Sequence, residues 1–366
     1  MKKNPIVYVF AFILILIFLF DILEPKKSFS EIENRNLAQK PKLSIKSLED
    51  GSYTKNFEAY INDNFLLRDD WISLKSISEY VLGKIENNNI IYGENGYMFD
   101  KIDSYDEKRF KKNLEALNMF IDKFDGRVTT MIVPNSYVIY GEYLPLGANL
   151  LNQKKIINEI YKSTSKDKNI DLVELFSKHK DEYIYYKTDH HWTTKGAYLA
   201  YSEYMSSIGE VPIDLNEFKK NEVNDFYGTY FSKAKAFNAE SDVITYYDIE
   251  NITMDIQGEK YNSLYDYEKL NARDKYSVFI RGNNGLTIIK NNEIENGKKL
   301  IVFKDSFANS MIPFLSQNFE EIHVIDLRSF SMKVSEYVKN TKIEEVLILY
   351  NTESFLDEVN IVRLKY

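Results

Sequence analysis

The sequence predicts an α/β protein whose parallel sheet is covered by helices on both faces. From about residue 100 onward, short apolar runs alternate with amphipathic segments, which is typical of strands buried between two helical layers. Polar clusters follow several of these runs, at the strand ends where such sheets bind ligands. A long apolar run near the N-terminus adds a membrane-spanning helix to the predicted architecture.

The composition limits the classes of function. The 366 residues are 44% hydrophobic and 28% charged, as in an ordinary globular protein. The formal net charge of -8 argues against a general affinity for nucleic acid. Cysteine is absent, which excludes disulfides, thiolate metal sites and cysteine nucleophiles.

Residues 1–23 are predicted to form a transmembrane signal anchor. Lys2 and Lys3 precede an apolar run from Pro5 to Phe20, and no cleavage site of small residues follows it. The positive charge before the run places the N-terminus inside the cell. We therefore expect a single-pass protein of the cytoplasmic membrane, with the bulk of the chain extracytoplasmic.

The remaining chain is expected to divide into an extension and a main domain. Residues 24–99 are predicted to form a stalk, amphipathic helices near 57–65 and 71–82, and a hairpin over 88–99. Residues 100–366 form the α/β domain, interrupted at about 211–296 by an irregular, β-rich insertion. Helices are predicted over 106–124, 153–165, 194–207, 307–317 and 331–340, with strands over 128–133, 170–175, 183–186, 300–303, 322–325 and 346–350. Inside the insertion we expect strands over 243–247, 277–280 and 287–289.

Ser306 is the candidate nucleophile. It follows the predicted strand 300–303 and precedes an apolar helix, so its hydroxyl lies where unpaired backbone N–H groups and the helix dipole can stabilise an oxyanion. A serine nucleophile needs a base, and the base needs an orienting acid. The alternative is that Ser306 is an ordinary helix N-cap.

Asp189 and His191 are the candidate acid and base, within the stretch Thr188–Gly196 that holds two of the four histidines. In an Asp-x-His sequence the two side chains can lean to one side, whereas neighbours in a strand point to opposite faces. The opposite assignment, with His190 as base, stays open, as does a solvated strand end. A metal site is disfavoured because three consecutive residues rarely converge on one ion, so we predict neither metal nor cofactor.

Further side chains are candidates for binding substrate or stabilising an oxyanion. Asn135, just after a predicted strand, could donate its amide to an oxyanion, or it could close the strand as an Asx-turn or cap. Arg328 could clamp a ligand, or it could pair with Asp326 or Asp305. The remaining candidates are Phe307, Asn283 and His190.

Several sequence blocks resemble those of a known family. The tetrapeptide Asp189-His190-His191-Trp192 resembles the signature of the DHHW family of low-GC bacteria. More distantly, the chain is similar to alginate O-acetyltransferases of the AlgX and AlgJ type, which are SGNH-hydrolase-like. The blocks that carry the resemblance are Glu33-Asn34-Arg35-Asn36-Leu37, Gly51-Ser52-Tyr53, Asp63-Asn64-Phe65-Leu66-Leu67-Arg68, Val133-Pro134-Asn135-Ser136, Arg281-Gly282-Asn283-Asn284-Gly285, Lys304-Asp305-Ser306-Phe307 and Asp326-Leu327-Arg328.

The resemblance implies an SGNH-like, flavodoxin-like fold and an activity. Asp189, His191 and Ser306 take the places of acid, base and nucleophile, although the relatives have other residues than Lys304-Asp305 before the serine. The implied reaction moves an O-acetyl group onto a cell-surface or exported polysaccharide, with a membrane-bound O-acyltransferase supplying the acetyl group. Alternatives are a carbohydrate acetyl esterase with the same triad and a non-catalytic envelope-assembly or glycan-binding protein.

Overall fold

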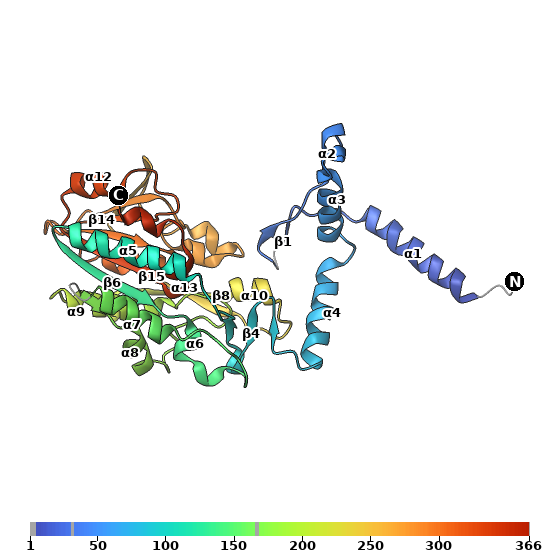
Figure 1. Cartoon of the computed structure of the whole chain (residues 1–366), viewed down its shortest axis with the longest axis horizontal. Helices are drawn as coiled ribbons and strands as arrows, with labels where there is room; N and C mark the ends of the chain where they lie inside the picture. Colours follow the sequence, from blue (N-terminus) through green and yellow to red (C-terminus); the bar gives the residue numbers. More distant parts are fainter. Residues whose placement is uncertain (1–4, 31–32, 165–167, 366) are drawn as a thin grey trace. The chain divides into compact units, whose positions relative to one another are not determined.

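The computed structural model describes residues 5–30, 33–164 and 168–365, and the chain divides into two compact units (Figure 1). The smaller unit comprises Met1–Lys84 and Ser232–Asn238, and the larger comprises Ile85–Phe231 and Ala239–Tyr366. The larger unit contains the central sheet and every candidate site residue.

The smaller unit begins with an apolar helix, α1 (Pro5–Leu23), which is long and apolar enough to cross a membrane and would equally suit a signal sequence. A two-stranded ribbon, β1 (Phe29–Ser30) and β2 (Arg35–Asn36), follows it. The helices α2 (Ile45–Glu49), α3 (Ser52–Asp63) and α4 (Arg68–Val81) follow, and α3 and α4 overlap the two segments predicted to be helical.

An ion-pair network connects the ribbon with helices α3 and α4. Arg35 donates two hydrogen bonds to Asp63, at 2.6 and 2.9 Å, and this guanidinium lowers the pKa of Asp63 to about 2. Glu33 accepts from Arg68 at 2.6 Å and also pairs with Lys235, which belongs to the same unit. The charged residues of the Glu33–Leu37 and Asp63–Arg68 blocks are therefore structural partners of one another.

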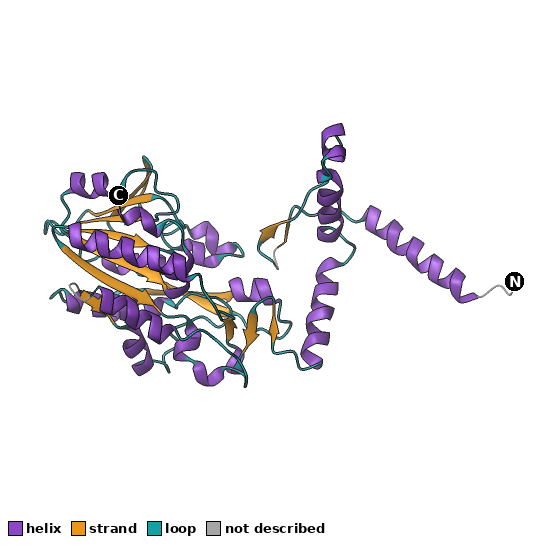
Figure 2. Cartoon of the chain, viewed as in Figure 1, coloured by secondary structure: helices purple, strands orange, loops and turns teal. Residues whose placement is uncertain are grey.

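The larger unit is built on an eight-stranded sheet with the order β11-β10-β12-β14-β13-β15-β6-β7 (Figure 2). Five strands run parallel: β14 (Glu321–Ile325), β13 (Lys299–Lys304), β15 (Glu345–Asn351), β6 (Arg127–Val133) and β7 (Lys168–Ile170). The strands β12 (Leu286–Asn291), β10 (Ile252–Ile256) and β11 (Glu259–Tyr261) extend it by antiparallel pairing. The predicted α/β class with a parallel-rich sheet is confirmed.

Helices cover both faces of this sheet because successive strand residues point to opposite sides. Along β13, Leu300 and Val302 belong to one core cluster, while Ile301 and Phe303 belong to the other. The second cluster includes α5 (Glu107–Lys123), which crosses β6 and β15 in Figure 1, with α7 (Gln153–Ser163), α12 (Val334–Thr341) and α13 (Thr352–Asp357). The first cluster includes α6 (Ser136–Ile139), α8 (Leu172–Lys178), α9 (Thr194–Ser207) and α11 (Ile312–Leu315).

Smaller sheets lie outside the central one. The predicted hairpin forms β4 (Ile90–Tyr92) and β5 (Met98–Asp100), with β3 (Glu86–Asn87) added as a third strand. Within the segment 211–296, β8 (Lys220–Phe226) pairs with β9 (Asp242–Tyr247), and the short helix α10 (Thr229–Ala234) lies between them in the chain. Strands β10 to β12 of the same segment continue the central sheet.

Four local predictions are wrong. The strand expected over 170–175 ends at Ile170, because Asp171 caps α8 by accepting from the backbone of Val173 and Glu174. The segment 183–186 forms a loop with a bridge between Tyr185 and Trp192. The strand expected over 277–280 does not form: residues 277 and 278 end a 3₁₀ helix, η5 (Lys275–Val278), and Phe279 makes only an isolated bridge with Tyr265.

The fourth wrong prediction concerns the helix expected over 307–317. It is split into a 3₁₀ helix, η6 (Ser306–Ser310), and α11. Pro313 explains the split, because it has no N–H to donate to the carbonyl of Asn309 in a continuous α-helix.

Candidate active site

Ser306 is the first residue of η6, immediately beyond strand β13. Asp305 caps this helix: its Oδ1 accepts from the Phe307 backbone N–H at 2.9 Å, and its Oδ2 accepts from the Asn351 N–H at 2.7 Å. Burial raises the pKa of Asp305. The capping role suggested for Ser306 therefore belongs to Asp305, and the Ser306 hydroxyl bonds elsewhere.

Phe307, a predicted candidate for binding substrate or stabilising an oxyanion, has a backbone N–H that is already engaged. That group already donates to the Asp305 carboxylate, so it is not available to a substrate oxygen. The Phe307 ring instead packs against His191, with ring centroids 4.9 Å apart.

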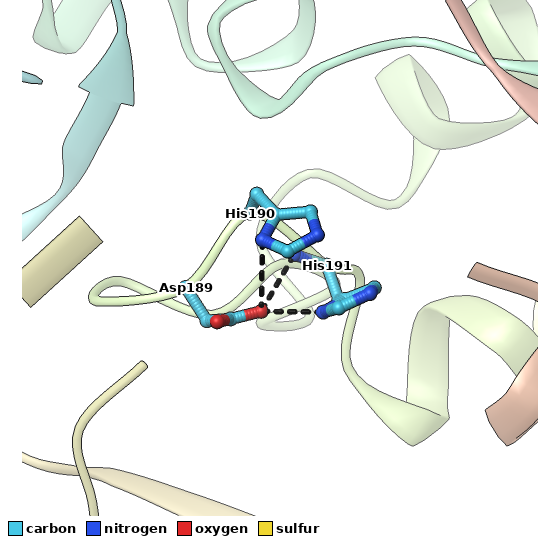
Figure 3. Close-up of side chains that lie close together, drawn as sticks. All are labelled: Asp189, His190 and His191. Atoms are coloured by element: carbon cyan, nitrogen blue, oxygen red, sulfur yellow. Dashed lines mark hydrogen bonds and ion pairs between the residues drawn. The ribbon is translucent and has the colours of Figure 1, made fainter. Parts of the chain in front are cut away.

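His191 joins the serine to an acid. Its Nε2 lies 2.8 Å from Ser306 Oγ, and its Nδ1 lies 2.6 Å from Asp189 Oδ1. The same carboxylate oxygen accepts from the His191 backbone N–H at 3.0 Å (Figure 3). The three side chains thus form one hydrogen-bonded chain at the carboxyl end of the sheet, with His191 rather than His190 between the acid and the serine.

Asp189 is held from its other side by the segment that follows β8. Its Oδ2 accepts from the backbone N–H of Thr229 at 2.8 Å and from the Thr229 hydroxyl at 3.1 Å. Gly228 packs so closely that a Cβ there would lie 2.2 Å from the Asp189 Cβ. Burial opposes the charge of this carboxylate, but His190, His191 and the hydrogen bonds lower the pKa of Asp189 below its usual range. Asp189 is therefore an ionised, immobilised acceptor.

His190 supports this arrangement from the loop itself. Its Nδ1 lies 2.7 Å from the Thr229 hydroxyl, and its ring centroid is 3.8 Å from that of His191. Since the Thr229 hydroxyl donates to Asp189, it can accept from the His190 N–H.

Two aromatic side chains fix the serine-bearing helix. Trp192 Nε1 donates to the Phe307 carbonyl at 2.9 Å and to Ser310 Oγ at 3.0 Å. Tyr276, from η5, stacks on the His191 ring with centroids 3.7 Å apart and planes 10° apart. Sequence reasoning missed Tyr276, Gly228 and Thr229, because each lies tens of residues from the partner that it supports.

Asn283, a predicted binding candidate, is exposed and is tied to the serine-bearing helix through its side-chain oxygen. Its side-chain oxygen accepts from the buried Lys304 Nζ at 2.7 Å and from the Asn309 amide at 3.2 Å. Lys304 also donates to Asn309 at 2.6 Å, and burial lowers the pKa of Lys304 to about 8. The Arg281–Gly285 block thus braces η6, and its turn includes the left-handed Arg281 (φ 56°).

Asn135 and Arg328 are each held by a neighbour. The Asn135 side-chain oxygen accepts from Gln153 Nε2 at 2.9 Å, and its backbone N–H donates to Gln153 Oε1 at 2.9 Å. The side-chain oxygen of Asn135 is therefore bonded to Gln153. The N–H₂ group of the same amide is the part of Asn135 that can donate a hydrogen bond to a substrate oxygen. Arg328 Nε donates to Asp326 Oδ1 at 2.8 Å within a two-point ion pair, which is the alternative that the sequence left open for it.

Asp189, His190 and His191 bring ligand-type atoms within 4.8 Å of one another, close enough for a metal ion. The donor set argues for hydrogen bonding instead. Both Asp189 oxygens already accept two hydrogen bonds each, and His191 Nε2 is directed at the Ser306 hydroxyl. A cation at this position would have to break the chain of contacts that joins the three side chains.

The fold and site together define the chain as an α/β protein that aligns an aspartate, a histidine and a serine at the carboxyl edge of its central sheet. The family model of the DHHW proteins matches residues 116–325. The chain therefore belongs to the DHHW family.

Three solved structures are similar to this chain, and the first two share its fold. A DHHW family protein from Eubacterium siraeum is 26% identical, with a TM-score of 0.67 over 77% of this chain and 96% of its own. Bacillus cereus PatB1, solved with a sulfonyl adduct, is 21% identical, with a TM-score of 0.63 over 76% of this chain and 98% of its own. The O-acetyltransferase domain of Pseudomonas putida AlgJ is 13% identical, with a TM-score of 0.48 over 76% of this chain and 98% of its own. No curated protein sequence matches the chain.

Proposed function

We propose that this protein is a membrane-anchored, extracytoplasmic O-acetyltransferase that acts on a cell-surface or exported polysaccharide through Ser306, His191 and Asp189. The observation that carries the proposal is the alignment of the three side chains, with contacts of 2.8 Å and 2.6 Å on the two nitrogens of one imidazole. Both distances are within the hydrogen-bond reach that a nucleophile and its base need. The resemblance to O-acetyltransferases supports the choice of reaction.

In the first half-reaction Ser306 Oγ attacks the carbonyl carbon of an acetyl donor. His191 Nε2 takes the hydroxyl proton as the new C–O bond forms, and ionised Asp189 stabilises the resulting imidazolium. The tetrahedral intermediate then collapses: the bond to the donor oxygen breaks, and His191 returns the proton to that leaving oxygen. The product is an acetyl ester on Ser306.

In the second half-reaction a sugar hydroxyl replaces the departed donor. His191 takes the proton of that hydroxyl while its oxygen attacks the acetyl carbon, and the proton is then returned to Ser306 Oγ as the enzyme ester breaks. We assign the Asn135 amide N–H₂ as an oxyanion donor in both steps, because Gln153 fixes the orientation of this amide. A membrane-bound O-acyltransferase would supply the acetyl group, with α1 holding this protein at the same membrane.

A serine-directed sulfonyl fluoride tests the nucleophile. We expect intact-mass and peptide mass spectrometry to find one adduct, at Ser306, in the wild type. Ser306→Ala and His191→Ala should each abolish it, while His179→Ala, which changes a half-exposed histidine paired with Glu182, should leave it unchanged. No adduct, or an equal adduct in His191→Ala, would contradict the proposal.

A second experiment separates transfer from hydrolysis. The wild type is incubated with an activated acetyl ester, with and without added glycan acceptors, and free acetate and acetylated glycan are both quantified. Acetylated glycan that disappears in Ser306→Ala is the expected result. Acetate release alone would identify an esterase, and full cellular function of Ser306→Ala would identify a non-catalytic role.

A further inference from the structure

Tyr276 contacts both His191 and the backbone of Ser306, although it is not one of the three side chains of the candidate reaction centre. The residue lies in η5, is buried, and belongs to a small aromatic cluster with Tyr186, Phe226 and Phe279. Its ring lies flat on the His191 imidazole, with centroids 3.7 Å apart. Packing in this cluster accounts for the burial of the Tyr276 ring. The Tyr276 hydroxyl, however, contacts a different part of the site.

The Tyr276 hydroxyl reaches the helix that carries the nucleophile. It lies 3.0 Å from the Ser306 carbonyl oxygen, 3.3 Å from the Phe307 carbonyl oxygen and 3.2 Å from Ser310 Oγ. Trp192 also donates to Phe307 and Ser310, so the contact with the backbone of Ser306 is what distinguishes Tyr276 from Trp192. Burial raises the pKa of Tyr276, which keeps its hydroxyl protonated as a donor.

We propose that Tyr276 is a positioning residue that sets the distance between base and nucleophile, its ring holding His191 and its hydroxyl holding the backbone of Ser306. This inference rests on the proposed function, because it assigns Tyr276 a part in the same acetyl transfer. A rigid side chain that touches both partners fixes the 2.8 Å contact between His191 Nε2 and Ser306 Oγ more firmly than two independent supports would.

The ring has a second effect on the base. The face of an aromatic ring attracts a cation, so the stacked ring stabilises the His191 imidazolium that forms when Ser306 is deprotonated. Among the described residues, Asp189 contacts His191 at Nδ1, and the ring of His190 lies 3.8 Å from that of His191. Both remain in place when Tyr276 alone is changed, so a variant can isolate the contribution of its ring.

Two substitutions separate the ring from the hydroxyl. Tyr276→Phe keeps the stacking and removes the hydrogen bond, so we expect the modification of Ser306 by a sulfonyl fluoride to slow by about two- to twelve-fold at every pH. Tyr276→Met fills much of the same volume without a ring. Here the reaction should slow further, and the midpoint of its pH–rate profile should fall by about 0.4 to 1.5 pH units, because the imidazolium is less stable.

The experiment measures the rate of adduct formation against pH in the full chain, with thermal melting of each variant as the test of folding. Tyr337→Leu is the matched control, since this tyrosine packs against another histidine, His323, and should change neither rate nor midpoint. A wild type that forms no adduct defeats the proposed function. A wild type that reacts through His191 while Tyr276→Met keeps its rate and midpoint overturns the role of Tyr276 alone. If Tyr276→Met does not fold, Tyr276→Phe decides: a slower rate with an unmoved midpoint supports the role, and an unchanged rate refutes it.

Discussion

Replacement of Asp189 by asparagine changes the acid with the smallest change of shape. Each carboxylate oxygen accepts two donors: Oδ1 accepts from the backbone and Nδ1 of His191, and Oδ2 from the backbone and hydroxyl of Thr229. An asparagine has one acceptor oxygen and one donor nitrogen. Whichever way the amide is turned, its N–H₂ group faces two N–H or O–H groups in a buried site.

Both orientations of the new amide are expected to slow the reaction of Ser306, but for different reasons. If the nitrogen faces His191, the imidazole must carry its proton on Nε2, and then it cannot accept the Ser306 proton. If the nitrogen faces Thr229, the backbone N–H and the hydroxyl of Thr229 lose their acceptor. In both orientations the negative charge that stabilises the imidazolium is gone. We expect Ser306 modification to slow by about 10³- to 10⁴-fold, or about 4 to 5 kcal/mol in the barrier. The unsatisfied buried donor lowers the free energy of unfolding by about 1–3 kcal/mol.

The assay is the second-order rate of sulfonyl fluoride modification, with denaturant unfolding measured on the same samples. Asp171→Asn is the control, because asparagine also caps helices and Asp171 caps α8 far along the chain from Ser306. A folded Asp189→Asn protein that reacts within ten-fold of the wild-type rate would show that this carboxylate does not orient the base.

Three further predictions concern other parts of the structure. Gly228→Ala places a Cβ 2.2 Å from that of Asp189 and should slow Ser306 modification by about 10²-fold or more. The control Gly141→Ala, with nothing within 4 Å of its added Cβ, should keep the wild-type rate. Equal rates for the two variants would contradict the role of close packing at Gly228. The native pKa of Lys304, about 8, lies below its ordinary 10.5, so the unfolded chain binds the extra proton between these values and the free energy of unfolding rises with pH there. In denaturant titrations at pH 8 and pH 10, Lys304→Met should reduce the rise in the free energy of unfolding by at most about 3 kcal/mol. An equal rise in the wild type and in Lys304→Met would refute this prediction. Deletion of residues 1–23 should move the protein from the membrane pellet to the soluble fraction of fractionated cells, and full retention in the pellet would place the anchor elsewhere.

The strands and helices of the central sheet were largely predictable because local pattern and burial agree there. The apolar runs that form β6, β13 and β15 are buried on both faces, so their composition alone marks them as strands. Helix α9 was predicted at its observed bounds, and Thr193 caps it by accepting from the Gly196 N–H. The end of β13 places Ser306 at the edge of the sheet, whereas Asp189 and His191 reach it from a loop.

The supports of the site were not predictable, since they depend on contacts between distant segments. Nothing local separates Tyr276 from the other 27 tyrosines, and its role follows only from the position of η5 against His191. The aromatic run 183–186 has a strong strand propensity, yet the buried Asp242 carboxylate binds the backbone of Lys187 and Thr188 and holds the segment as a loop. Asp305 and Ser306 are both favoured capping residues, and only the structure shows that Asp305 caps η6.

The contact between His191 and Ser306 joins residues 115 positions apart in the chain, and the two segments that brace it come from between them. Closing such a separation is slow compared with forming local helices, so the reaction centre is expected to be among the last parts of the larger unit to form. During refolding, helical circular dichroism should recover before the ability of Ser306 to react. Reactivity of one serine would then report the completion of folding, which no spectroscopic signal from the helices alone can do.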